Sequence, residues 1–168
     1  MNFIDLKGPI VANTVYVDGQ LVARDVTITL PSVTPTTSDY KAMGTMSLPI
    51  PGQIESMELA ITKIGIDLGL ARMVRMQSMN FEFRFVQNVV KSDGTTMPEG
   101  CKAFVKAVPK TIPGISLEPG SASENEITAE ATRYQLFVGG EEMWLIDRLS
   151  QILRILGTDY YSPINSML

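Results

Sequence analysis

Histidine is absent from the 168 residues of this sequence, and cysteine occurs once, at Cys101. Without histidine, the commonest general base and metal ligand at neutral pH is missing, so no Ser-His or Cys-His catalytic pair can form. A single cysteine excludes an internal disulfide framework and any metal site that needs several cysteines. We therefore expect a protein that is not an enzyme and that binds no metal or cofactor.

Clusters of basic residues and long apolar runs are also lacking. The net charge is −4, which disfavours a sequence-independent grip on nucleic-acid phosphates and favours a basic partner. The N-terminus carries Asp5 and Lys7 in place of a basic segment and an apolar run, and no stretch approaches the roughly 20 apolar residues of a membrane span. We expect synthesis in the cytoplasm, with no Sec-type signal and no membrane anchor.

The residues that are present predict one folded body rich in β-strands. Hydrophobic residues make up 45% of the chain against 19% charged, a balance typical of a single domain spanning residues 1–168. The Asp18-Gly19 pair between β-forming residues indicates a tight hairpin, and Phe81, Phe83 and Phe85 share one face of a later strand. Further strands are expected at residues 26–30, 56–64 and 101–108.

One short helix is expected between these strands. Asp67 is a good N-cap, and apolar and basic residues follow it at helical spacing, although Gly69 is a poor helix former. The residues at this spacing are Leu68, Ala71, Arg72 and Arg75. The helix is predicted to flank the main β-structure.

Residues 132–149 are predicted to form a long hairpin that turns at Gly139-Gly140. Its first strand is expected from Thr128 to Val138, and its second from Glu141 to Ile152 or as far as about Leu156. The expected cross-strand pairs are Val138 with Glu141, Leu136 with Met143, and Tyr134 with Leu145.

Two segments are too apolar for idle loops. Residues 31–52 are rich in Thr, Ser, Pro and Gly, yet they retain Tyr40, Met43, Met46 and Leu48. The C-terminal residues 158–168 keep two tyrosines, Ile164 and Leu168 around a proline. Apolar side chains in such segments usually dock on something.

Candidate chemical sites have plainer interpretations. Cys101 lies on an alternating strand, where a small buried apolar residue is favoured over a nucleophile. Glu141 and Glu142 are strand neighbours that point to opposite faces, so they cannot share a substrate. Residues 65–69 lack the glycine spacing and the lysine of a phosphate-binding loop. Most of the ten methionines fit gap-filling in a core better than an adaptable contact surface.

The order of these elements resembles a known family over nearly the whole chain. The matching residues are Val17-Asp18-Gly19, residues 26–34, Tyr40, Met43-Gly44, residues 55–58, Tyr134, Leu136, Gly139-Gly140, Glu142 and Ile146-Asp147. This set resembles the major tail tube protein of contractile, P2-like phages and of R-type bacteriocins. The sequence departs from the pattern at Lys41-Ala42, where glycine is more usual, and in its apolar C-terminal tail.

The resemblance implies a mainly β fold: an antiparallel β-barrel or sandwich protomer with one short flanking helix and long β-hairpin arms. It further implies hexameric rings that stack into a rigid tube inside a contractile sheath. The partners would be other copies of the chain, the sheath protein, tube initiator or baseplate and terminator proteins, a tape measure protein in the lumen, and DNA that passes through without specific binding. The particle would assemble in the bacterial cytoplasm as a phage tail or a headless bacteriocin and leave on lysis.

The resemblance also suggests roles for particular segments. Residues 35–53 would form an arm that docks on the next ring, and residues 158–168 a C-terminal docking tail. The inter-ring contacts would be Tyr40, Met43, Met46 and Leu48, and the turn of the long hairpin would be Gly139 and Gly140. The carboxylates expected to face a basic sheath are Asp67, Glu118, Glu124 and Glu126.

Two other classes of protein remain open at this point. One is the hexameric ring protein of type VI secretion systems, which resembles tail tubes in fold. The other is a monomeric β-barrel that binds a ligand, for which Phe81, Phe83, Phe85 and Trp144 would line the cavity, although a packed core accounts for these aromatics more simply.

Overall fold

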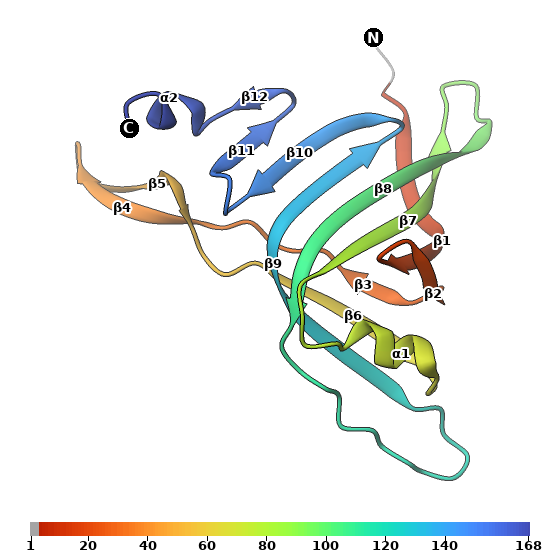
Figure 1. The fold of residues 1–168 in the computed structure, drawn as a ribbon. Helices are drawn as coiled ribbons and strands as arrows, with labels where there is room; N and C mark the ends of the chain where they lie inside the picture. Colours follow the sequence, from red (N-terminus) through yellow and green to blue (C-terminus); the bar gives the residue numbers. More distant parts are fainter. Residues whose placement is uncertain (1–3) are drawn as a thin grey trace.

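The computed structural model describes residues 4–168, which form twelve strands and two short helices (Figure 1). The strands are β1 (Leu6–Val17), β2 (Gln20–Arg24), β3 (Thr27–Thr29), β4 (Pro35–Lys41), β5 (Thr45–Ile54), β6 (Glu58–Ile64), β7 (Met79–Val90), β8 (Thr96–Pro109), β9 (Glu124–Val138), β10 (Glu141–Asp147), β11 (Ile152–Ile155) and β12 (Thr158–Asp159). The helices are α1 (Leu68–Met73) and α2 (Ser162–Asn165). The mainly β prediction is confirmed.

Ten strands belong to one antiparallel sheet in the order β12-β11-β10-β9-β8-β7-β1-β2, with β6 and β3 attached through β9. Strand β9 is long enough to have two successive neighbours along one side: β6 pairs with residues 124–130, and β10 with residues 133–138. In residues 4–168, β2 and β3 do not pair, so the sheet curls without closing into a barrel. Next to this gap, the side chain of Asn13 on β1 bonds the backbone N–H and C=O of Val26 at 3.0 and 2.7 Å, and the Asp25 N–H bonds the Asn13 backbone oxygen at 2.9 Å.

The core lies inside the curl of this sheet, between β7, β8 and β9 on one side and β6, β3, β2 and α1 on the other. Phe81 and Phe83 on β7 are buried with stacked rings 6.0 Å apart, so they belong to a packed core and do not line a ligand cavity. Leu59 from β6 and Met73 from α1 belong to the same cluster. Cys101 is also buried, and burial raises the pKa of its thiol, which confirms its interpretation as an apolar strand residue.

Helix α1 begins where the sequence predicts. The carboxylate of Asp67 accepts a hydrogen bond from the Leu70 N–H at 3.0 Å and so caps the first turn. Gly69 has a packing reason, because a Cβ there would collide with the backbone oxygen of Val22. The second helix, α2, was not expected from the sequence; Pro163 lies in its first turn, where a missing N–H costs nothing.

The long hairpin differs from the prediction in its register. The chain turns at Gly139 and Gly140 with φ of 59° and 85°, and Val138 pairs with Glu141. Met143 is then an extra residue in a β-bulge, so the expected pairs Leu136–Met143 and Tyr134–Leu145 do not form. The actual pairs are Leu136 with Trp144 and Tyr134 with Ile146. The bulge turns Trp144 and Ile146 toward the core, where the Trp144 ring meets Tyr134 edge-on at 6.1 Å.

The second strand of this hairpin is also shorter than predicted. It ends at Asp147, whose side chain accepts hydrogen bonds from the N–H groups of Leu149 and Ser150, both at 3.1 Å. An aspartate that bonds the backbone two and three residues ahead makes a turn. The chain therefore reverses into β11, and no single strand runs from Glu141 to Ile152 or Leu156.

Candidate assembly surfaces

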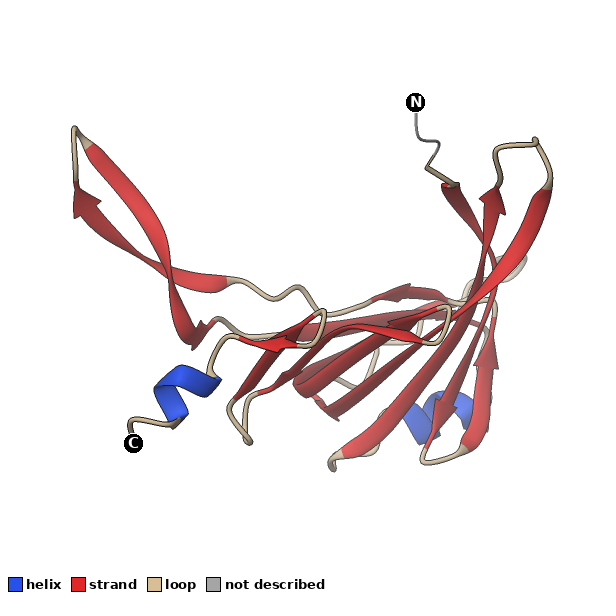
Figure 2. Ribbon diagram, turned by 90° about the horizontal axis from the view of Figure 1, so that it is seen from above, coloured by secondary structure: helices blue, strands red, loops and turns tan. Residues whose placement is uncertain are grey.

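Strands β4 and β5 form a hairpin of their own, which we call the arm (residues 35–54). The two strands pair only with each other among the described residues, and the arm stands away from the large sheet (Figure 2). Its tip turns at Met43 and Gly44, which both have positive φ, and the Ala42 N–H bonds the Gly44 oxygen at 2.9 Å. Loop-like sequence thus becomes an ordered hairpin.

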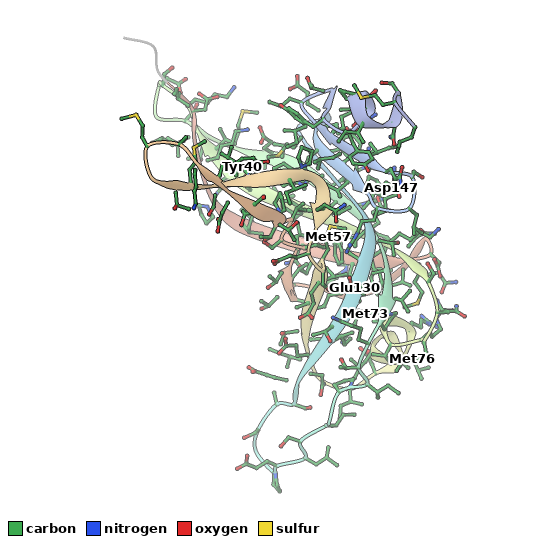
Figure 3. The ribbon with its side chains drawn as sticks, turned by 90° about the vertical axis from the view of Figure 1, so that its left-hand side faces the viewer. Tyr40, Met57, Met73, Met76, Glu130 and Asp147 are labelled. Carbon is green, nitrogen blue, oxygen red and sulfur yellow. The ribbon has the colours of Figure 1, made fainter. Side chains whose placement is uncertain are left out.

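The arm has one apolar and one polar face. Tyr40 pairs with Met46, and Ser38 with Leu48, so Tyr40, Met46 and Leu48 share one face. The other face carries Thr37, Asp39, Lys41, Thr45 and Ser47. Tyr40 is 51% exposed and lies on the arm, apart from Met57 and Glu130 of the body (Figure 3). Met43 at the tip is fully exposed, so all four predicted arm residues present apolar surface to solvent in the isolated subunit.

The large sheet has an unpaired edge along the first half of β1. Pairing with β2 begins only at Thr14, so residues 6–12 have β7 on one side and no strand on the other within the described chain. Leu6, Ile10 and Val11 on this segment are more than half exposed. At the opposite end the sheet finishes in the two-residue strand β12 and the uncovered start of β10. Such edges are templates for pairing with another chain.

Residues 128–138 of the long hairpin do not offer such an edge. They lie on β9, which has neighbours on both sides, namely β8 on one and β6 followed by β10 on the other. An interior strand has no free N–H and C=O groups for a neighbouring subunit. The free edges lie instead at residues 6–12 of β1 and at the β10–β12 end of the sheet.

The second face of the large sheet is uncovered. Where it is formed by β1, β2, β7, β8, β10, β11 and residues 133–138 of β9, it is basic, and we call this region the bare face. Beyond it, β6 and residues 124–130 of β9 continue the same side of the sheet with Glu58, Glu124, Glu126 and Glu130. Cross-strand partners point to the same side, so the pairing of Arg84 with Lys102 and of Lys106 with Arg133 places all four on the bare face. The same register adds further charged residues. The full set is Arg24, Arg84, Lys102, Lys106, Arg133 and Arg154 against Glu82, Glu142 and Asp147.

Three of these basic residues are neutralised locally. Arg154 makes a two-pronged contact with Glu142 at 2.7 and 3.1 Å, which lowers the pKa of that carboxyl, Arg84 bonds Glu82 at 2.9 Å, and Arg133 lies 3.7 Å from Asp147. The surplus positive charge on the bare face comes from Arg24, Lys102 and Lys106, although the chain as a whole has a net charge of −4.

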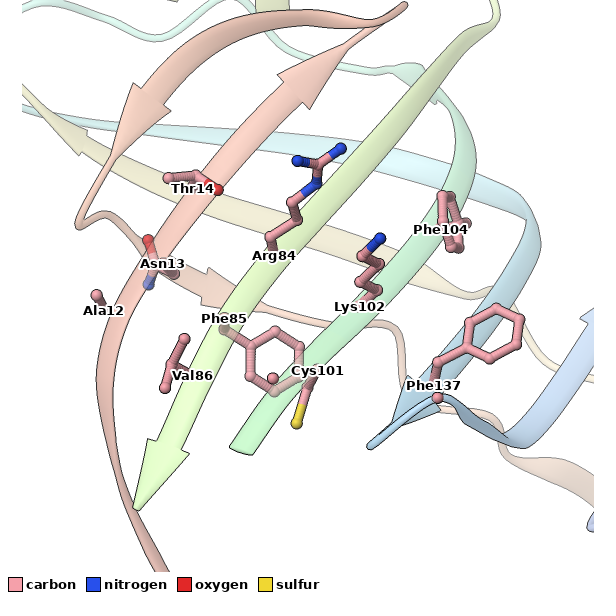
Figure 4. A pocket seen from close by; sticks show the side chains of 12 residues that line it. Ala12, Asn13, Thr14, Arg84, Phe85, Val86, Cys101, Lys102, Phe104 and Phe137 are labelled. Carbon is pink, nitrogen blue, oxygen red and sulfur yellow. The ribbon is translucent and has the colours of Figure 1, made fainter. Parts of the chain in front are cut away.

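A hollow of about 610 Å³ opens on the bare face (Figure 4). Gly100 supplies part of its floor, where the absence of a side chain leaves room, while Arg84 and Lys102 border it. Phe104 and Phe137 form another side, with their rings edge to face at 5.8 Å. Basic and aromatic groups therefore lie together on this face, a combination that the acidic composition concealed.

The predicted sheath-facing carboxylates are all exposed. Glu124 and Glu126 lie on β9, where they alternate with buried Asn125 and Ile127. Glu118 lies in the connection between β8 and β9, near residues 65–66. Asp67 already has a partner, because Lys63 bonds its carboxylate at 2.8 Å and lowers its pKa. Its charge is the least available of the four.

No group of three or more potential metal ligands occurs in residues 4–168. None of the helices in this part of the chain is both long and apolar enough to cross a membrane. The exposed apolar face of the arm and the free edge of β1 are candidates for contact between proteins.

The chain matches a known protein family over most of its length. Residues 9–168 match the family profile described as phage tail tube protein FII. The chain belongs to the phage tail tube protein FII family. It is therefore a structural component of a tail tube and not an enzyme, as the sequence predicted. No relative is found among curated proteins.

Two solved structures share the fold of this tail tube protein. One is the sheath–tube complex of an extracellular contractile injection system, PVC, in the extended state, with a TM-score of 0.51 and 16% identity over 75% of this chain and 88% of that one. The other is the sheath/tube terminator of that system, also extended, with a TM-score of 0.53 and 16% identity over 77% of this chain and 95% of that one. At this level of identity the likeness shows the fold alone.

Proposed function

We propose that this tail tube protein forms hexameric rings that stack into the rigid inner tube of a contractile tail, which is driven through a target envelope when the sheath contracts. The observation that carries the proposal is the arm, whose one apolar face has no cover in the isolated subunit. An exposed apolar face of this kind marks a surface that another molecule covers.

Ring closure would use the two ends of the large sheet. The free edge of β1 at residues 6–12 would lie against the β10–β12 end of the neighbouring subunit, so that all the sheets join into one barrel. The bulky layer of β6, β3 and α1 covers one face of the sheet and would stay on the outside. The bare face would then line the lumen.

Stacking would use the arm. Its apolar face, with Tyr40, Met46 and Leu48, would lie on the adjacent ring, with Met43 at the tip as a further contact. Burial of these side chains would stabilise the stack by about 25 cal/mol for each Å² of apolar surface removed from water. The C-terminal residues 158–168 would support the same contact.

The remaining partners follow from this position inside a tail. Glu118, Glu124 and Glu126 are exposed carboxylates that would meet basic residues of a sheath, with Asp67 contributing less because Lys63 pairs with it. Initiator or baseplate and terminator proteins would cap the ends of the tube. A tape measure protein, and then DNA in a phage, would occupy the lumen without specific binding.

A direct test is sedimentation velocity of the purified protein over a range of concentrations, followed by negative-stain microscopy. The proposal predicts rings or hollow tubes that grow with concentration. Monomers at every concentration would contradict it. Free rings that do not bind a co-produced sheath protein would instead favour a type VI-like ring protein.

A further inference from the structure

The root of the arm contacts the C-terminal part of the chain at two points. The first is Arg148, in the turn that follows β10. Its guanidinium donates hydrogen bonds to the backbone oxygens of Ile54, at 3.0 Å, and Glu55, at 3.4 Å. A side chain that bonds two successive carbonyls fixes the direction of the backbone between them.

The second point is Tyr161, whose ring lies directly against Gly52 on β5. A Cβ at residue 52 would overlap the ring carbons of Tyr161, so only glycine permits this contact. The φ of Gly52 is +78°, which gives a second reason for glycine at this position. Close contact between an aromatic ring and a bare backbone leaves little freedom for either.

Tyr161 is itself held in place by the turn around β12. The carboxylate of Asp159 accepts hydrogen bonds from the backbone N–H of Tyr161 at 2.9 Å and of Leu153 at 3.4 Å. The Tyr160 N–H bonds the Leu153 oxygen at 2.8 Å. The apolar tail thus has a defined position next to the arm, instead of extending freely from the body.

The arm has few other means of holding its direction. Its strands pair only with each other in the described chain, and both ends leave through short connections to the body. At this root the Glu55 N–H bonds the Thr34 oxygen at 2.9 Å, which joins the two ends of the arm to each other and not to the sheet. Ile54 at the root packs against the core cluster, and beyond it the direction of the hairpin depends on Arg148 and Tyr161.

We propose that the C-terminal segment from Arg148 to Tyr161 is a latch that sets the angle at which the arm leaves the body. Arg148 and Tyr161 are positioning residues: they orient the apolar face of the arm without being part of it. The consequence for ring stacking rests on the proposed function, whereas the fixed angle itself is a property of the single subunit.

The angle can be measured in the free subunit by electron spin resonance distances between two spin labels. One label is placed at the arm tip by Ala42→Cys and the other on β8 by Lys106→Cys, with Cys101→Ala to remove the buried thiol. The latch predicts one narrow distance distribution. In Tyr161→Ala and in Arg148→Ala the distribution should broaden, by about twofold in width, because the arm samples several angles.

Adjacent and conservative variants provide matched controls. Tyr160 is next to Tyr161 in the chain and is 54% exposed. Tyr160→Ala should keep the narrow distance distribution. Tyr161→Phe should keep it too, because the contact with Gly52 is made by the ring carbons. A distribution in Tyr161→Ala as narrow as in Tyr160→Ala would overturn the latch, provided that circular dichroism shows both variants folded.

Substitution of the glycine tests the same contact from the other side. Gly52→Ala should displace the Tyr161 ring and broaden the distribution. Added to Tyr161→Ala, it should broaden the distribution less than it does alone, because the ring that it displaces is already gone and only the backbone strain at positive φ remains. Independent, additive broadening by the two substitutions would contradict a direct latch contact.

Tube assembly of the same variants separates the latch from the proposed function. If the arm joins the rings, Tyr161→Ala should polymerise less than Tyr160→Ala at equal concentration. A broadened distribution with normal tubes would uphold the latch and refute the role of the arm in stacking. A narrow distribution with failed tubes would refute the latch and leave that role standing.

Discussion

Two hairpins of this chain, the arm and the β9–β10 hairpin, have the same local design and opposite surroundings. Both alternate apolar with polar side chains across a tight turn that has positive φ. In β9–β10 the chain covers the apolar side itself, with Tyr134 and Ile146 inside the core. In the arm, Tyr40, Met46 and Leu48 remain uncovered. The β9–β10 hairpin therefore buries its apolar surface within the subunit, whereas the apolar surface of the arm is available to another molecule.

Deletion of residues 36–48 should have the largest effect on assembly and almost none on folding. The arm contributes no residue of the buried core cluster before Ile54, so the body keeps its packing. We expect a soluble, β-rich protein that forms no tubes by negative-stain microscopy. Tubes of normal length from this deletion would show that the arm is not needed for stacking.

Gly140→Val should lower the stability of the subunit as well as its assembly, because the hairpin that contains Gly140 belongs to the body. Gly140 has a φ of 85° and open space around its Cα, so valine would suffer backbone strain but no collision. The expected cost is on the order of 1 to 3 kcal/mol of unfolding free energy. Thermal unfolding should show a lowered Tm, and tubes should be lost with it. An unchanged Tm with lost tubes would place this turn in the ring interface instead.

Substitutions on the two faces of the arm should have different effects on tube growth. Tyr40→Ser, Met46→Ser and Leu48→Ser together should abolish or strongly slow tube growth, measured by light scattering, without lowering Tm, because these side chains are exposed. The matched control replaces Thr37, Thr45 and Ser47 on the opposite face with alanine. Equal effects from the two triple variants would refute the distinction between the faces.

Asp67 tests the body alone and should give a smaller effect. Asp67→Ala removes the cap of α1, at a cost of about 1 kcal/mol, whereas Asp67→Asn should retain most of it. The hydrogen bond from Lys63 lowers the pKa of Asp67, so its contribution is present above the ordinary carboxyl pKa and fades as the pH falls through the lowered value. The difference in Tm between wild type and Asp67→Ala should therefore shrink in acid. A constant difference at all pH values would contradict this.

Neutralising the exposed carboxylates should give the smallest effect on the subunit. Glu118→Gln, Glu124→Gln and Glu126→Gln should leave Tm and tube growth nearly unchanged, because surface charges contribute little to stability. Attachment of a sheath should weaken and lose its dependence on salt. Unchanged attachment with the same salt dependence would remove these residues from the sheath contact.

The sequence was a good guide wherever structure depends on neighbours in the chain. The Asp67 cap and the Asp18-Gly19 turn are local, and the alternation of Phe81 and Phe83 follows from the two-residue period of a strand. Each was predictable because its cause lies within a few residues. The family resemblance rested on the same local features.

Features set by contacts between distant segments were not predictable. The bulge at Met143 arises because Trp144 and Ile146 pack against the core. The geometry of the core depends on other segments of the chain, so the sequence of the hairpin alone does not predict the bulge. The free edge of β1 depends on where β2 stops pairing with it. The contact of Tyr161 with Gly52 joins opposite parts of the chain, and neither residue carries a signal for the other.

In the proposed tube, the arm is the part of the subunit that another ring completes. A cryo-EM reconstruction of the assembled protein would locate the two faces of the arm. We expect hollow tubes of stacked hexameric rings, with Tyr40, Met46 and Leu48 buried against the adjacent ring and the polar face of the arm turned to solvent or to the sheath. Tubes in which that apolar face remains in solvent, or folds back on its own subunit, would contradict it.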